Sequence, residues 1–138
     1  MPMIVRWPGH IQAGTTSNLV WAFWDVLPTF AELAGVETPP GGDGLSVVPT
    51  LLGRPGQKEH EFLYWEFHEG RTSGQAVRMG NWKAVRPSPD APLQLYDLGT
   101  DLGETHDLAA EHPDVVAAIE DDLKTARTES QYWPLKGD

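Results

Sequence analysis

Two strand-like runs separated by Gly80-Asn81 constrain the fold of this chain more than any other feature. The runs cover residues 76–79 and 82–85 and are rich in apolar side chains. A two-residue connection of glycine and asparagine between such runs is typical of a β-hairpin. Residues 61–68 and 93–96 have similar strand-like patterns. The sequence therefore predicts a small antiparallel sheet of four strands in the second half of the chain.

A helix is expected after the sheet, from His112-Pro113 to about Arg127. Proline suits the first helical position, because its missing N–H has no partner there in any case. Asp114 near the start and Lys124 near the end complement the helix dipole. The apolar side chains recur at helical spacing and form one stripe: Val115, Val116, Ile119, Leu123 and Ala126. The sequence predicts that this stripe covers one face of the sheet.

The first half of the chain has a different pattern, so we divide the chain into residues 1–57 and residues 58–138. The short apolar run at residues 3–7 predicts a buried strand, which would be an exposed sheet edge if its neighbours were missing. Whether residues 18–24 form another strand or lead into a helix stays open.

One helix is predicted in this half, and one helical turn follows it. Asp25 is placed to cap a helix that runs to about Ala34, with Gly35 as its C-terminal stop. Leu27, Phe30, Leu33 and Ala34 would share its apolar face. Residues 46–52 predict a short helical turn, and the polar run at residues 53–61 reads as a linker.

The overall composition fits a globular protein and narrows the class of partner. The chain has 138 residues, 40% of them hydrophobic, and six tryptophans, which is enough for one core. A formal net charge of -10 argues against nucleic acid as a partner, since that would need a basic surface. No run approaches the roughly 18 apolar residues of a membrane span. The absence of cysteine excludes disulfides but leaves bacterial periplasm and cytoplasm both open.

Short motifs along the chain resemble those of sulfatases of the arylsulfatase type, and they occur in the same order. The motifs are PMIVRWPG (2–9), WDVLPT (24–29), LAG (33–35), DGLS (43–46), PTLLG (49–53), YWE (64–66), VRMGNWK (77–83), LYDL (95–98), Asp101 and GET (103–105). The resemblance covers nearly the whole chain and implies the C-terminal part of a sulfatase, in the alkaline phosphatase superfamily. The fold class it implies is α/β to α+β: a remnant of the larger α/β domain, then a four-stranded antiparallel sheet packed on a C-terminal helix.

The resemblance also defines what this chain lacks. In family enzymes a formylglycine made inside a C-x-P-x-R or S-x-P-x-R motif attacks the sulfate ester, and a calcium ion polarises it. The chain has no cysteine and no serine that begins such a motif. It has no Asp-Asn pair, and the adjacent Asp121 and Asp122 point apart on a helix. We therefore assign no catalytic residue and no metal ligand, and expect calcium and formylglycine only in a full-length enzyme.

Five residues are candidates for contact with a substrate. His68, Glu69 and Arg71 belong to a polar segment after a predicted strand, of the sort that lines pockets. The predicted hairpin also places Arg78 opposite Lys83, and two facing cations favour an anion between them. That anion is either an internal carboxylate, with Glu66 as the candidate, or an external group such as a substrate sulfate.

Three functions remain open from the sequence. The first is the structural, pocket-shaping end of a sulfatase whose N-terminal α/β domain performs the chemistry on a sulfate ester. In that case the chain is the closing part of a longer polypeptide and is inactive alone. The second is a free-standing module that binds another protein. The third is part of a related phosphoester or phosphonate hydrolase of the same superfamily.

Overall fold

The computed structural model of the chain describes residues 3–68 and 72–137. By its internal contacts the chain forms an N-terminal unit, Met1–His60, and a C-terminal unit, Glu61–Asp138. Each unit has its own architecture, and each is described by itself.

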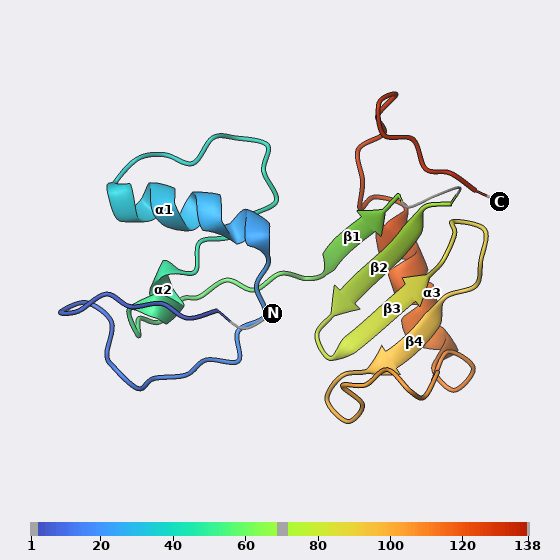
Figure 1. Cartoon of the computed structure of the whole chain (residues 1–138), viewed down its shortest axis with the longest axis horizontal. Helices are drawn as coiled ribbons and strands as arrows, with labels where there is room; N and C mark the ends of the chain where they lie inside the picture. Colours follow the sequence, from blue (N-terminus) through green and yellow to red (C-terminus); the bar gives the residue numbers. More distant parts are fainter. Residues whose placement is uncertain (1–2, 69–71, 138) are drawn as a thin grey trace. The chain divides into compact units, whose positions relative to one another are not determined.

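The C-terminal unit contains a four-stranded antiparallel sheet with the strands in sequence order (Figure 1). This arrangement confirms the predicted sheet. The strands are β1 (Leu63–Phe67), β2 (Gly74–Met79), β3 (Trp82–Arg86) and β4 (Gln94–Asp97).

The β2–β3 hairpin has the register that the sequence predicts. Met79 pairs with Trp82 and Arg78 pairs with Lys83 across the two-residue turn. Gly80, the first turn residue, has φ 59°, which glycine adopts without the steric penalty that a Cβ would bring. A glycine at this position lets the turn follow the right-handed twist of the two strands.

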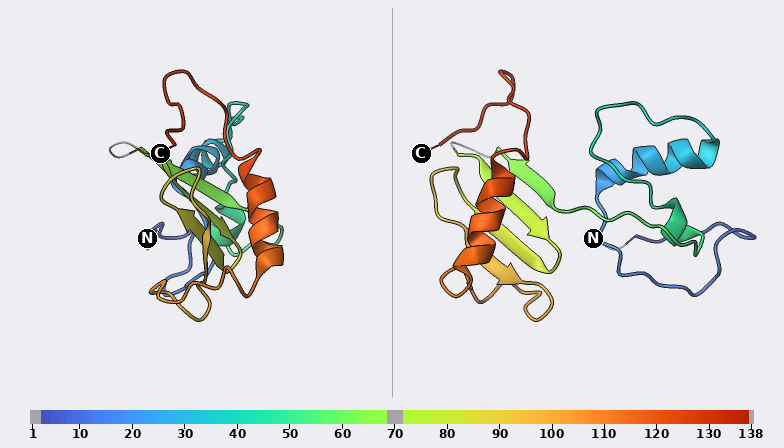
Figure 2. Two further views of the ribbon diagram at one scale, coloured as in Figure 1. Left: turned by 90° about the vertical axis from the view of Figure 1, so that its right-hand side faces the viewer. Right: turned by 180° about the vertical axis from the view of Figure 1, so that it is seen from behind.

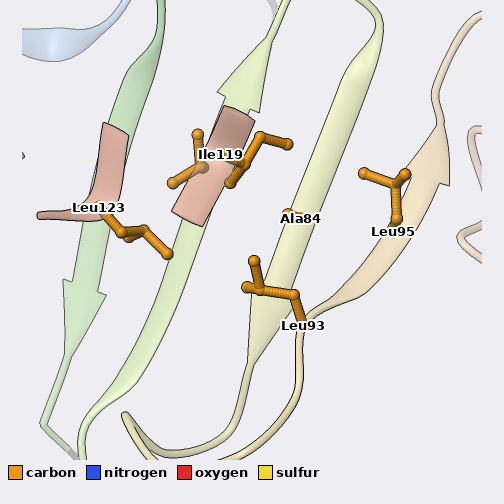
Figure 3. Packing of buried hydrophobic residues seen from close by; sticks show 6 residues of the cluster. Ala84, Leu93, Leu95, Ile119 and Leu123 are labelled. Atoms are coloured by element: carbon orange, nitrogen blue, oxygen red, sulfur yellow. The ribbon is translucent and has the colours of Figure 1, made fainter. Parts of the chain in front are cut away.

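Helix α3 (Pro113–Leu123) lies across one face of this sheet (Figure 2). Its apolar stripe packs against side chains from alternate strand residues, and Figure 3 shows Ile119 and Leu123 of the helix with Ala84 and Leu95 of the sheet in the same cluster. Ile119 is fully buried, and burying such a side chain contributes about 1.5–3 kcal/mol. The core consists of Val77, Ala84, Leu93, Leu95, Ile119 and Leu123.

The helix ends earlier than predicted. It stops at Leu123 rather than near Arg127, and residues 124–127 continue in turns. The reason is an interaction that helical periodicity does not reveal, because Arg127 leaves the helix direction and donates to Glu66 on β1 at 2.9 Å.

The N-terminal unit contains a 3-10 turn, η1 (Phe23–Asp25), followed by α1 (Val26–Ala34) and α2 (Val48–Leu51). The predicted end of α1 is confirmed, since Gly35 has φ 68° and closes the helix with its N–H. The predicted capping by Asp25 is wrong in its chemistry. Its carboxylate makes no cap bond to α1 and instead accepts the N–H groups of Ala22 (2.7 Å) and Leu45 (2.8 Å).

One other prediction for this unit is wrong. Residues 3–7 are extended but exposed and outside any described strand, and Ile4 is 96% exposed. Of the two alternatives left open for residues 18–24, the structure shows the second, since residues 18–22 lead into η1. On α1, Leu27 and Phe30 are 58% and 64% exposed, while Thr29 is buried. A strand and an apolar helix face become buried only against other elements, and the described residues supply none at these places.

Candidate functional site

The predicted site residues fall at two opposite ends of the sheet in the C-terminal unit. His68 follows β1 at the β1–β2 connection, whereas Arg78 and Lys83 flank the β2–β3 hairpin (Figure 1). Glu69 and Arg71 lie outside the described residues. The structure therefore keeps His68 apart from the Arg78–Lys83 pair.

The hairpin cations have separate partners. Lys83 Nζ lies 2.5 Å from Glu104 Oε1, and Arg78 Nε donates to the carbonyl oxygen of Gly80 at 3.2 Å. The prediction that Glu66 is the internal partner of these two cations is wrong. Glu66 pairs across the sheet with Gln75 instead. Glu104, whose φ is 52°, lies in a loop 21 residues after Lys83. Strand alternation therefore could not identify it as the partner of Lys83.

The β1–β2 end of the sheet holds a denser group, here called the loop-base cluster: Tyr64, Glu66, His68, Ser73, Gln75 and Arg127. Glu66 is at its centre, because its carboxylate accepts from Tyr64 Oη (2.7 Å), His68 Nε2 (3.2 Å) and Arg127 Nε (2.9 Å). Arg127 Nη2 adds a second, longer bond to the same carboxylate at 3.4 Å. This forked geometry is typical of strong arginine–carboxylate pairs.

A line of hydrogen bonds joins Ser73, His68 and Glu66. Ser73 Oγ lies 2.8 Å from His68 Nδ1, and the Nε2 of the same ring faces Glu66. All three groups are satisfied when the hydroxyl donates to Nδ1 and the Nε2–H donates to the carboxylate. A Ser–His–acid line is also the pattern of hydrolase triads, but Ser73 is fully buried and its Oγ accepts the N–H of Lys136 at 2.7 Å. The line therefore supports structure and is not poised for attack on a substrate.

Burial and hydrogen bonding shift the pKa of two cluster members. Burial opposes ionisation of Glu66, but the bonds from Tyr64, Arg127 and His68 outweigh it and hold the pKa of Glu66 below its ordinary value. Burial, reinforced by the Glu66 carboxylate, raises the pKa of Tyr64 to about 12. Glu66 is thus an ionised acceptor at neutral pH, and Tyr64 is a protonated donor.

The cluster continues along the helix-covered face. Gln75 donates to Tyr64 Oη at 2.7 Å and accepts from Arg86 Nε at 2.7 Å, and Arg86 lies 3.5 Å from Glu120 of α3. Sequence reasoning missed this network. Part of it could have been predicted, since residues two apart on a strand share a face and Tyr64 and Glu66 are so placed. No sequence pattern indicated that Arg127 is their long-range partner.

A second buried carboxylate organises the N-terminal unit. Asp25 is 1% exposed and, besides its two backbone donors, lies 2.8 Å from His60 Nε2. Thr29 Oγ1 accepts the N–H of Val47, which ties α1 to the segment before α2. Gly44 belongs to the same packing, because a Cβ there would lie 2.3 Å from the Trp24 carbonyl oxygen. These contacts have a structural role.

Two kinds of site are not found in residues 3–68 and 72–137. These residues contain no group of three or more His, Cys, Asp or Glu side chains that could hold a metal ion. None of their helices is long and apolar enough to cross a membrane.

Comparison with known families gives a match over most of the chain. Residues 1–130 match the family described as N-sulphoglucosamine sulphohydrolase, C-terminal. Among curated proteins, mouse (Mus musculus) steryl-sulfatase is 38% identical over 144 residues, which covers 80% of this chain and 22% of the enzyme. The chain spans about a quarter of the length of the curated relatives it matches (22%, 24% and 25%).

Solved structures give the same picture. A protein solved in complex with its substrate D-glucosamine-2-N,6-O-disulfate has TM-score 0.75 and 25% identity, with 89% of this chain and 27% of that chain covered. The phosphonate monoester hydrolase of Agrobacterium radiobacter has TM-score 0.59 and 22% identity, with 83% and 28% covered. The second likeness concerns the fold alone.

Proposed function

Because the chain belongs to the family of C-terminal N-sulphoglucosamine sulphohydrolase domains, we propose that it is the closing, pocket-shaping part of a sulfatase, an enzyme that hydrolyses a sulfate ester. The observation that carries this proposal is the match over residues 1–130. The sheet covered by α3, a fold shared with solved sulfatases, supports it.

In this proposal the groups that break the ester bond belong to another part of the enzyme. The chain contains no cysteine, and no serine begins the S-x-P-x-R motif. Its described residues contain no cluster that could hold a metal ion. The residues present do not fit a formylglycine or a calcium site, and no catalytic step is assigned to them. Both groups, by resemblance, belong to the N-terminal α/β domain of a full-length enzyme.

The surface of the N-terminal unit supports the existence of such a partner domain. Residues 3–7 form one side of an open groove of about 910 Å³, with residues 11–17 and part of α2 around it. Ile4, which is 96% exposed, also lines an adjoining pocket together with Phe30 of α1, which is 64% exposed. Contiguous exposed apolar surface of this kind is typical of an interface. We assign it to contact with the N-terminal sulfatase domain.

The contribution to the substrate pocket is assigned to the β1–β2 connection. Glu69 and Arg71 are the residues proposed to face the sulfated substrate. The side chain of His68 is 4% exposed and both its ring nitrogens have partners, so its part is to hold the base of the connection. Arg78 is retained as a separate anion contact at the hairpin, with Lys83 already paired to Glu104.

Two measurements test the proposal. The isolated 138-residue chain is expected to hydrolyse 4-nitrophenyl sulfate no faster than buffer, and turnover by the pure chain would overturn it. The DNA upstream of the Met1 codon is expected to encode, in frame, a C-x-P-x-R or S-x-P-x-R motif. A ribosome-binding site directly upstream, with no such motif, would favour the free-standing module.

Two observations also fit the other candidate functions, the free-standing module and the related hydrolase. The exposed apolar groove would also suit a free-standing module that binds another protein, and a soluble, monomeric chain with two-state unfolding is expected in that case. The likeness to a phosphonate monoester hydrolase shows that this fold also occurs outside sulfatases. Turnover of a sulfate ester, compared with turnover of a phosphonate monoester, by the enzyme assembled with its N-terminal domain separates these two functions.

A further inference from the structure

The last described residues, 131–137, lie beyond the part of the chain that matches the family, and they contact the loop-base cluster. We call them the C-terminal tail. The family match ends at residue 130. The described tail nevertheless returns to the end of the sheet where β1 and β2 are connected.

Two reciprocal hydrogen bonds join the tail to Ser73. The N–H of Ser73 donates to the carbonyl oxygen of Lys136 at 2.9 Å, and the N–H of Lys136 donates to Ser73 Oγ at 2.7 Å. Ser73 is fully buried. If these hydrogen bonds broke and no water replaced them, buried polar groups would be left unpaired. The tail is thus bonded to the residue immediately before β2.

Trp133 makes the second contact, with the other end of the same connection. Its ring lies edge-on to the His68 ring, with 4.3 Å between ring centroids and an interplanar angle of 62°. Its carbonyl oxygen accepts from Arg127 Nη2 at 2.7 Å, which links it to the arginine that pairs with Glu66. Tyr132, the neighbouring aromatic residue, is 86% exposed.

We propose that the C-terminal tail is a clasp that fixes the two ends of the β1–β2 connection, His68 and Ser73, relative to each other. Trp133 and Ser73 are then positioning residues for that connection. The clasp itself is independent of the enzyme's identity, and only its importance for a sulfated substrate rests on the proposed function.

The clasp gives the polar groups at this end of the sheet partners within the chain. His68 is bonded to Ser73 on one side and to Glu66 on the other, while Trp133 covers its ring. His68 is thus in contact with Glu66 of β1, with Ser73 just before β2 and with Trp133 of the tail. The hydrogen bonds of such a network depend on one another. Removal of the tail would therefore first loosen Ser73 and His68, which contact it directly.

Amide hydrogen exchange on the full chain tests the clasp. Trp133→Ala, and a chain ending at Ser130, are expected to raise the exchange rate of the Ser73 N–H by about tenfold, the loss of roughly one hydrogen bond. Tyr132→Ala is the matched control and is expected to leave this rate unchanged. The β3 amides, in the middle of the sheet, are expected to exchange as in the unchanged chain in all three variants.

A spectroscopic signature distinguishes positioning from general stabilisation. The ring proton signals of His68 are expected to move in Trp133→Ala and to stay close to the original position in Trp133→Phe, which keeps an aromatic ring. Unchanged Ser73 exchange and unchanged His68 signals in Trp133→Ala would overturn the clasp. Equal acceleration of the Ser73 and β3 amides would also overturn it, because the tail would then stabilise the whole unit.

A kinetic measurement connects the clasp to the proposed function. In the enzyme assembled with its N-terminal domain, Trp133→Ala is expected to raise KM for a sulfate ester several-fold with kcat nearly unchanged. Absence of turnover by the intact assembled enzyme would contradict the proposed function and leave the exchange result standing. An unchanged KM alongside altered Ser73 exchange would remove the link to the substrate.

Discussion

Single carboxylates organise both units of this protein. Asp25 and Glu66 are each mostly buried, and each accepts three or more hydrogen bonds, from near neighbours and from residues 20 or more positions away. A buried charge is stable only when donors replace the water it has lost. Loss of either carboxylate would therefore leave several donors without a partner.

At Asp25 the expected effect is a loss of stability of the N-terminal unit. Asp25→Ala leaves the N–H groups of Ala22 and Leu45 unpaired and should cost about 3 kcal/mol. Urea unfolding followed by amide exchange at these two positions measures it. Asp43→Ala, at an exposed residue of the same unit, is the control and should change stability by less than about 0.5 kcal/mol. Equal effects of the two substitutions would contradict the structural role of Asp25.

At Glu66 the expected effect depends on pH. Its pKa is lower in the folded than in the unfolded chain, so its stabilising contribution is complete above about pH 4.3. That contribution is lost as the pH falls through the lower folded value. Glu66→Gln should thus lower the urea midpoint at pH 7 and flatten the decline of that midpoint as the pH falls below about 4.3.

The exposed Glu111 provides the control for that titration. Glu111 is 64% exposed in its side chain and lies 3.9 Å from His106, a loose pair. Glu111→Gln should keep the pH dependence of the unchanged chain. A decline in Glu66→Gln as steep as in the unchanged chain would show that Glu66 does not contribute in this way.

At the scale of elements, most of the C-terminal unit could be predicted from local pattern. Strand alternation predicted β1 to β4, and Gly80-Asn81 predicted the hairpin register. Both patterns depend on neighbouring residues alone. Pro113 gave the start of α3. The helix end could not be predicted, since Arg127 leaves the helical course to bind Glu66, which lies 61 residues away.

Packing of α3 on the sheet gives a prediction at this scale. Ile119→Ala removes a fully buried side chain from the core and should destabilise the C-terminal unit by about 2–5 kcal/mol. Leu102→Ala is the matched control, because Leu102 is 83% exposed in the same unit, and should be nearly neutral. Thermal and urea unfolding measure both. Comparable losses in the two variants would mean that α3 does not pack as described.

At the scale of the whole molecule, the N-terminal unit exposes much more apolar surface than its size requires. Ile4, Phe23, Leu27 and Phe30 are 96%, 79%, 58% and 64% exposed. Of these, Ile4 and Phe30 line one pocket, and exposed apolar surface of this kind is typical of an interface. This surface fits a chain whose relatives are about four times as long, and it supports the proposed contact with an N-terminal domain.

Self-association of the isolated chain is the corresponding prediction. Leu27→Lys with Phe30→Lys should raise the concentration at which the chain associates by at least about tenfold, because two large apolar side chains are removed from the contact. Sedimentation velocity measures it. Tyr132→Lys, at an 86% exposed residue of the other unit, should have no effect. A monomeric unchanged chain at high concentration would instead favour the free-standing module.

The sequence by itself determined the family resemblance, the sheet, its hairpin register and the existence of both long helices. These features depend on short-range pattern, which a single chain displays in full. The tertiary structure decided the partners of Asp25, Lys83 and Glu66, and the contact of Trp133 with His68. Such contacts join residues that the folded backbone brings together, and no periodicity encodes them. The exposure of residues 3–7 follows the same rule, since a strand-like run is buried only when a sheet surrounds it.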